Sequence, residues 1–137
     1  MALNRHGNSE RINVILDTNA LMMPAQFSVD LEVGLLELLG GFRALVPAEV
    51  VYELRGLALG SSRKSAAAKF GLEFAKRFEV IPEHDAGVSV DDKIVLAARE
   101  FNAVVVTNDR GLKDKLTALQ IPVIVLREKR RLELTGR

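Results

Sequence analysis

Short apolar runs alternate with longer helical segments along this chain, and this alternation limits the fold more than any other feature. The β-rich runs predict five strands, at residues 11–16, 42–46, 78–81, 103–106 and 121–126. Helices are expected at about residues 30–39, 47–59, 63–77, 89–100 and 111–119. After the first strand, a short helical turn should stop at Pro24. Strands that alternate with helices form parallel sheets with right-handed crossovers. We therefore predict a three-layer α/β/α fold with a central parallel five-stranded sheet in the order 3-2-1-4-5.

The length of 137 residues suits a single domain. We expect residues 1–10 to be a flexible N-terminal tail, residues 11–126 to form the domain, and residues 127–137 to be a basic C-terminal tail with no sheet to join. The chain has no cysteine, which excludes disulfides and thiol chemistry. No apolar run approaches the roughly 20 residues of a membrane span. We expect a cytoplasmic protein with no membrane partner.

Polar side chains follow the first and fourth predicted strands, at the points where burial should end. Asp17, Thr18 and Asn19 come directly after the apolar residues 14–16, and Asp109 follows the run 103–106. In the predicted order these two strands are neighbours at the switch point of the sheet, where ligands bind outside the carboxyl ends. Either aspartate could instead simply cap the helix that follows it.

Two further acids follow the second and third predicted strands. Asp91 lies in the first turn of its helix and faces the carboxyl edge, whereas the adjacent Asp92 fits a capping arrangement with Ser89. Glu53 lies about two turns into its helix and can reach back over the same edge, although its context fits a solvated residue equally well. Glu49, one turn earlier, is expected to be exposed. The acids expected to meet at one edge are Asp17, Glu53, Asp91 and Asp109.

Crowded carboxylates need a compensating proton or cation. Two unit charges 4 Å apart repel by roughly 4 kcal/mol at an effective dielectric constant near 20. Oxygen ligands favour hard ions, so the expected cofactor is Mg²⁺ or Mn²⁺. The chemistry that such a site serves is hydrolysis of phosphodiester bonds, in which the metal activates water and neutralises developing charge.

The residues around these acids resemble the PIN domain family of small metal-dependent nucleases. The resemblance covers about residues 12–126 and is carried by four stretches in family order: VILDTN at 14–19, PAEVVYEL at 47–54, VDDKI at 90–94 and VVTNDR at 105–110. It implies a metal-dependent endoribonuclease in which Asp17, Glu53, Asp91 and Asp109 are the catalytic and metal-binding acids. Asp92 is a candidate extra ligand. Asn19 is a further polar group facing the site, and the resemblance implies that Thr107 or Asn108 hydrogen-bonds to the ligands.

The resemblance leaves the cellular role open among three alternatives. The runs 91–94 and 109–113 are more similar to PIN proteins of ribosomal RNA processing. VapC-type toxins of toxin–antitoxin pairs have this size, but often carry an aromatic residue where this chain has Leu112. The third alternative is an inactive PIN scaffold that binds RNA or protein. The corresponding partners are an RNA substrate, a second copy in a homodimer, and an antitoxin or a ribosome-assembly protein.

An RNA substrate requires positive surface to offset phosphate charge. The net charge of +1 does not provide it, so local clusters must. Several basic clusters, Arg63 and Lys64 among them, are equally typical of solvated helix faces. The predicted RNA-binding residues are Lys113, Lys115, Arg127, Lys129, Arg130 and Arg131.

Two other classes with acids at strand ends do not fit the sequence. A receiver-type domain needs an aspartate that ends strand three and a lysine after strand five, where this chain has Pro82 and Arg127. A phosphatase with an Asp-x-Asp nucleophile motif needs a second aspartate at Asn19.

Overall fold

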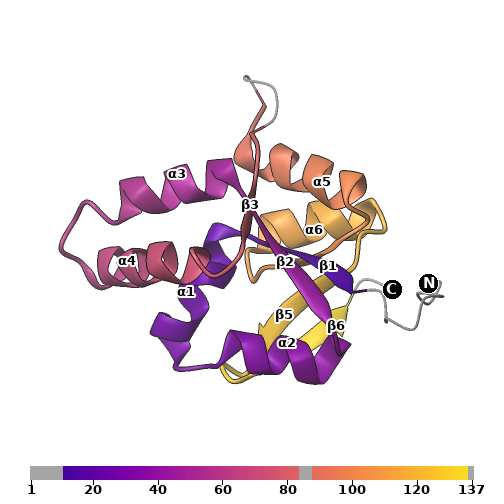
Figure 1. The fold of residues 1–137 in the computed structure, drawn as a ribbon, viewed down its shortest axis with the longest axis horizontal. Helices are drawn as coiled ribbons and strands as arrows, with labels where there is room; N and C mark the ends of the chain where they lie inside the picture. The colour runs from indigo at the N-terminus through magenta and orange to yellow at the C-terminus, as the bar shows by residue number, and fades with distance from the viewer. Residues whose placement is uncertain (1–10, 84–87, 136–137) are drawn as a thin grey trace.

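Six strands and six helices make up the part of the chain that the structure, a computed structural model, describes, residues 11–83 and 88–135 (Figure 1). In chain order they are β1 (Ile12–Leu16), α1 (Thr18–Phe27), α2 (Leu31–Leu39), β2 (Phe42–Pro47), α3 (Ala48–Leu57), α4 (Arg63–Ala75), β3 (Glu79–Ile81), α5 (Val90–Glu100), β4 (Val104–Val106), α6 (Arg110–Ala118), β5 (Val123–Arg127) and β6 (Arg131–Thr135). Among these residues no helix has the length and apolar character needed to cross a membrane.

The strands form one sheet in the order β3-β2-β1-β4-β5-β6, parallel except for the last pair. The predicted three-layer α/β/α fold and the order 3-2-1-4-5 are confirmed. Helices cover the sheet, with α2 on one side of the strands and α5 on the other (Figure 1). The central strands are buried on both faces, as parallel sheets require, and Val14, Ile15 and Leu16 are fully inaccessible to solvent.

The sixth strand corrects the expectation that residues after 126 have no sheet to join. Arg131–Thr135 pairs antiparallel with β5 through a three-residue connection, residues 128–130. Within it, the turn 127–130 is closed by a hydrogen bond in which Arg130 N–H donates to the Arg127 carbonyl at 3.0 Å. Both central residues, Glu128 and Lys129, have positive φ, as a type I′ hairpin turn demands. Such turns are normally signalled by Asn-Gly or Asp-Gly, and that signal is missing here. The predicted tail 1–10 and residues 136–137 lie outside the described residues.

The first helix is also longer than the sequence indicated. Pro24 does not stop it; α1 runs on to Phe27 with the proline inside it. A proline in a helix interior loses one hydrogen bond and normally destabilises the helix. Here Ala20, Leu21, Met22 and Met23 are all buried, so tertiary packing of α1 overrides the local preference.

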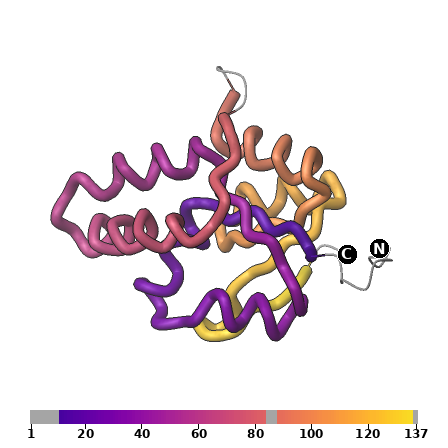
Figure 2. Tube along the Cα trace, in the orientation of Figure 1, coloured from indigo at the N-terminus to yellow at the C-terminus, as the bar shows by residue number. Residues whose placement is uncertain are grey.

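The close packing of α1, α3 and α4 depends on a glycine. Figure 2 shows the chain reversing between α3 and α4, so that the two helices lie side by side. Gly71 of α4 lies where α4 meets both other helices: a Cβ atom there would be 3.2 Å from Leu54 Cδ2 and 3.3 Å from the Leu21 carbonyl oxygen. Gly56 of α3, in contrast, has no atom within 4 Å of the corresponding position.

We expect Gly71→Ala to lower the free energy of unfolding by about 1–3 kcal/mol, because the added methyl group overpacks a contact with main chain. Gly56→Ala is the matched control and should raise it by about 0.5–1 kcal/mol, since alanine is the better helix former. Urea denaturation of both variants measures the difference. Equal effects of the two substitutions would show that α4 does not pack against α1 as closely as described.

Candidate active site

The pairing of β1 with β4 places the ends of two strands side by side. Leu16 pairs with Val106, so the next residues, Asp17 and Thr107, leave the sheet together. A hydrogen bond joins their side chains. Thr107 is fully buried and Asp17 is 4% exposed, so this contact lies at the base of the carboxyl edge.

A cleft of about 230 Å³ opens above this contact. Its lining includes all four acids that the sequence placed at this edge: Asp17, Glu53, Asp91 and Asp109. They come from the start of α1, from α3, from α5 and from the start of α6. The structure therefore brings together side chains that are separated by up to 92 residues in the sequence. Their roles as ligands and catalysts stay predictions.

Burial dominates the electrostatics of Asp17. Desolvation raises the pKa of its carboxyl group to about 7, from an ordinary value of 3.8. Hydrogen bonds from Thr107 and from the Ala20 N–H oppose the shift, and the nearby charges of Asp109 and Glu53 add to it. Burial also raises the pKa of Asp91, again with a contribution from Asp109. The negative charges of Asp109 and Glu53 thus act on Asp17 and Asp91 across the cleft.

Both strand-end aspartates are helix caps as well as cleft residues. Asp17 Oδ1 accepts the Ala20 N–H at 2.7 Å, and Asp109 Oδ1 accepts the Gly111 N–H at 2.9 Å. The capping alternative that the sequence left open is therefore realised for both. Capping engages one oxygen, however, and a carboxylate has two oxygens with about four lone-pair positions. A cap therefore does not exclude a second role in the cleft.

Glu53 is held at the cleft by a partner that the sequence analysis missed. The Thr18 hydroxyl donates a hydrogen bond to Glu53 Oε1 and so links the start of α1 to α3. Thr18 is buried whereas Glu53 is exposed. The hydrogen bond therefore holds one carboxylate oxygen of a side chain that otherwise faces solvent. The only sequence signal for it was the hydroxyl group between Asp17 and Asn19.

Asp91 and Asp92 are separated by their helix. Asp91 lines the cleft, whereas Asp92 lies outside it, exposed, with its carboxylate 3.1 Å from Lys115 Nζ. Hydrogen bonds from Lys115 and then Ser89 lower the pKa of Asp92. Ser89 caps α5 by accepting the Asp92 N–H at 3.1 Å, as the sequence indicated.

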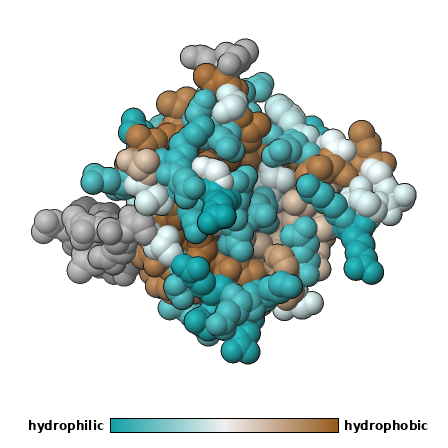
Figure 3. Space-filling model, turned by 180° about the vertical axis from the view of Figure 1, so that it is seen from behind, coloured by the Kyte–Doolittle hydropathy of each residue, from teal (hydrophilic) through white to brown (hydrophobic). Residues whose placement is uncertain are grey.

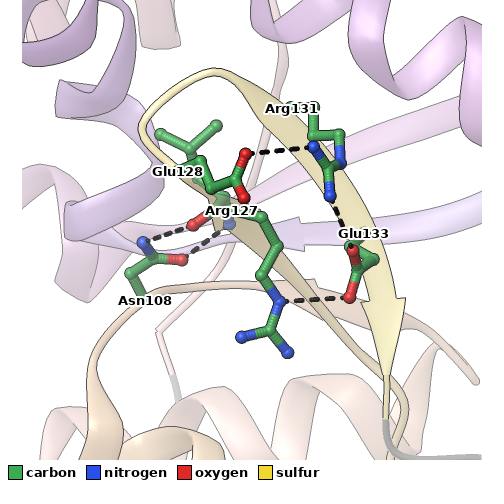
Figure 4. A network of polar contacts seen from close by, with 6 residues as sticks. Asn108, Arg127, Glu128, Arg131 and Glu133 are labelled. Atoms are coloured by element: carbon green, nitrogen blue, oxygen red, sulfur yellow. Dashed lines mark hydrogen bonds and ion pairs between the residues drawn. The ribbon is translucent and has the colours of Figure 1, made fainter.

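Asparagine side chains tie three strand ends together around the site. Asn19 Oδ1 accepts the Asn108 N–H at 2.8 Å, which links the ends of β1 and β4. The Asn108 amide in turn donates to the Leu126 carbonyl at 3.1 Å and accepts its N–H at 2.7 Å, which adds the end of β5 (Figure 4). Asn19 lines the cleft itself. These bonds fix the backbone from which Asp109 projects.

The expectation that Glu49 is exposed was wrong. Its side chain is 5% exposed and lies 3.5 Å from Lys93 Nζ, a pair that links α3 to α5. Glu49 and Glu53 lie one helical turn apart on the same face of α3, and the sequence alone does not show which of the two is covered.

The predicted RNA-binding residues are partly engaged within the protein. Arg127 pairs with Glu133 at 3.1 Å, and Arg131 pairs with Glu128 at 3.3 Å, as Figure 4 shows. Lys115 pairs with Asp92. Within the described part of the chain, the remaining three predicted residues have no ion pair: Lys113, Lys129 and Arg130.

The donor set fits a hard divalent cation in chemistry. Carboxylate oxygens surround the cleft, and a cation would relieve the unfavourable burial and repulsion that raise the pKa of Asp17. Among residues 11–83 and 88–135, however, no three acidic or histidine side chains are close enough to hold one ion as they stand. Ligation would therefore require some of these side chains to turn toward the ion.

Comparisons with known proteins agree with this geometry. The sequence model of the family described as "PIN like domain" matches residues 14–129. The chain is 33% identical over 132 residues to ribonuclease VapC9 of Archaeoglobus fulgidus, covering 96% of this chain and 95% of that protein. It is 24% identical over 127 residues to ribonuclease VapC4 of Methanocaldococcus jannaschii, covering 90% and 96%.

A solved structure is similar as well. The PIN domain endonuclease Utp24 superposes with a TM-score of 0.74 at 27% sequence identity, over 91% of this chain and 92% of that one. The fold and site define an α/β domain with an acidic cleft at the carboxyl edge of its sheet. The chain belongs to the PIN-like domain family.

We expect Asp17→Asn to stabilise the protein without metal, and more so at high pH. The unfolded carboxyl group ionises near 3.8, whereas the folded one keeps its proton up to about 7. Wild-type stability should therefore fall across this interval as the pH rises. Between pH 5 and pH 8, the stability difference between variant and wild type should grow by about 3 kcal/mol. Urea denaturation in EDTA measures it, and a difference independent of pH would contradict the assignment of a buried, protonated Asp17.

Proposed function

We propose that this protein is a divalent-metal-dependent endoribonuclease that hydrolyses RNA phosphodiester bonds at the acidic cleft. The observation that carries the proposal is the convergence of Asp17, Glu53, Asp91 and Asp109 on that cleft. Membership of the PIN-like family and similarity to proteins named ribonuclease support it.

The four acids differ in how firmly the structure holds them. Asp17 and Asp109, fixed by their caps and strand ends, are the more rigid ligands, and Glu53 and Asp91 complete the set from α3 and α5. A bound Mg²⁺ or Mn²⁺ would supply an activated water and neutralise charge on the phosphate. Binding requires Asp17 to release its proton, so affinity for the ion should rise as the pH approaches 7.

The cellular role has two candidates, each favoured by a different observation. Both curated relatives compared above are VapC ribonucleases, which favours a toxin-type enzyme controlled by an antitoxin. The runs 91–94 and 109–113, which are more similar to PIN proteins of ribosomal RNA processing, favour a role in that processing. Sequencing the ends of RNAs cut by the purified protein separates the two, because a processing enzyme cuts one precursor at defined positions.

We expect purified protein to shorten structured RNA with Mn²⁺ or Mg²⁺ and to stop when EDTA is added. Asp17→Asn should reduce the rate at least a hundredfold, because replacing even a residue that only orients a metal ligand costs about 10–100-fold. Asp114→Asn is the matched control, since Asp114 is exposed on α6 and lies outside the cleft. It should leave the rate unchanged.

Cleavage that survives excess chelator would contradict the metal-dependent mechanism. A scaffold without activity would give a different result: wild type and Asp17→Asn would retain RNA with similar affinity, and neither would shorten it.

A further inference from the structure

The ion pair that links α3 to α5 is buried, unlike the surface pairs of this protein. The side chains of Glu49 and Lys93 are 5% and 12% exposed, and Oε2 of the first lies 3.5 Å from Nζ of the second. In the pair Glu73–Lys76, in contrast, the side chains are 73% and 71% exposed. Figure 3 shows that ordinary arrangement from behind, with hydrophilic side chains gathered on the outer surface. A buried pair is uncommon enough to require a reason.

Stability alone does not supply that reason. Taking two ions out of water costs about as much free energy as their attraction returns, so apolar residues of similar volume often serve a fold equally well. An ion pair differs from an apolar contact in having one preferred geometry. Its best-attested use is to fix the register of the elements that it joins. The location of the pair therefore indicates what it fixes.

The pair lies where α3 and α5 begin. Glu49 is in the first turn of α3, and Lys93 is the fourth residue of α5. The two helices are in contact there, and Figure 1 shows them running to opposite sides of the view beyond this point. A fixed contact at the place where two helices diverge sets the angle between them.

Each of these helices carries an acid of the cleft close to the pair. Glu53 lies one helical turn after Glu49, and Asp91 precedes Lys93 by two residues. Since successive residues are about 100° apart around a helix, Asp91 and Lys93 point to different sides of α5. Neither Glu49 nor Lys93 lines the cleft. The pair can therefore place Glu53 and Asp91 without being a ligand itself.

The two strand-end acids do not need such a contact. Asp17 and Asp109 follow β1 and β4, and the pairing of these strands places them. Glu53 and Asp91 depend instead on how their helices are placed. Because some side chains must turn toward an ion before three of them can hold it, the placement of each helix decides which side chains can reach.

We propose that the Glu49–Lys93 pair positions α3 against α5 and thereby sets the separation of Glu53 and Asp91 across the cleft. Glu49 and Lys93 are positioning residues, which act on a divalent ion only through the two cleft acids. The proposal rests on the proposed function, because it assigns these two acids to one ion, and it deepens that function by naming what holds them in place.

Binding of Mn²⁺ tests the proposal without any cleavage. The electron paramagnetic resonance signal of free Mn²⁺ gives the affinity of wild type and of Glu49→Met/Lys93→Met. The double variant should bind Mn²⁺ about tenfold more weakly, since removing groups that orient metal ligands costs about 10–100-fold in affinity. Its urea midpoint should not fall, because replacing both members of a buried pair with apolar residues is often neutral or stabilising.

Glu73→Met/Lys76→Met is the matched control, because it removes the same two charges from an exposed pair outside the cleft. It should leave the affinity for Mn²⁺ unchanged. Glu49→Asp is a second variant, which keeps both charges but shortens the link by one methylene group. It should also weaken Mn²⁺ binding, though less than the double variant.

Two results would overturn the proposal. One is an equal loss of affinity in the control and in Glu49→Met/Lys93→Met. The other is wild-type affinity in both Glu49 variants; if their urea midpoints fall at the same time, the pair serves stability alone.

A distance measurement separates the role of the pair from the binding of the ion. Because the chain has no cysteine, spin labels can be attached at Arg55→Cys and Arg99→Cys, exposed positions toward the far ends of α3 and α5. Double electron–electron resonance in EDTA should give one narrow distance with the native pair and a broader or shifted distribution with Glu49→Met/Lys93→Met. Identical distributions would overturn the proposal. If wild type binds no Mn²⁺, the proposed function fails, while the distances still decide whether the pair positions the helices.

Discussion

The pairing of β1 with β4 is the constraint on which the site depends. It brings Asp17 against Thr107 at the end of two buried strands and starts α1 and α6 from the same edge of the sheet. Asn19 and Asn108 extend this arrangement to β5 through backbone hydrogen bonds. These contacts hold together the strand ends from which Asp17 and Asp109 project, and the helices α3 and α5 supply Glu53 and Asp91.

This arrangement works against the stability of the protein. A buried carboxyl group with other acids nearby keeps its proton to about pH 7, and only a cation or a proton makes its burial favourable. Sites that bind charge commonly conflict with stability in this way.

The sequence predicted the features that follow from strand periodicity and strand order. Asp17 directly follows the apolar run 14–16, and Asp109 follows the run 103–106 after two further residues, so the topology rule for parallel sheets placed them together. Sequence-based prediction failed where tertiary contacts determine the local structure. Pro24 is tolerated in α1 because its neighbours are buried, β6 forms on a turn with two non-glycine residues at positive φ, and Glu49 is covered by Lys93 while Glu53, one turn on, reaches the cleft. No local pattern marks Thr18 as the partner of Glu53.

The proposed function requires that four carboxylates from distant parts of the chain share a divalent cation. Anomalous X-ray scattering at the manganese absorption edge, from crystals grown with MnCl₂, tests it most directly. We expect a peak in the cleft within coordination distance of Asp17 and Asp109, with Glu53 or Asp91 turned toward it, and no such peak in Asp17→Asn crystals. Crystals saturated with Mn²⁺ that show no peak in the cleft, or only peaks elsewhere on the protein, would contradict the account.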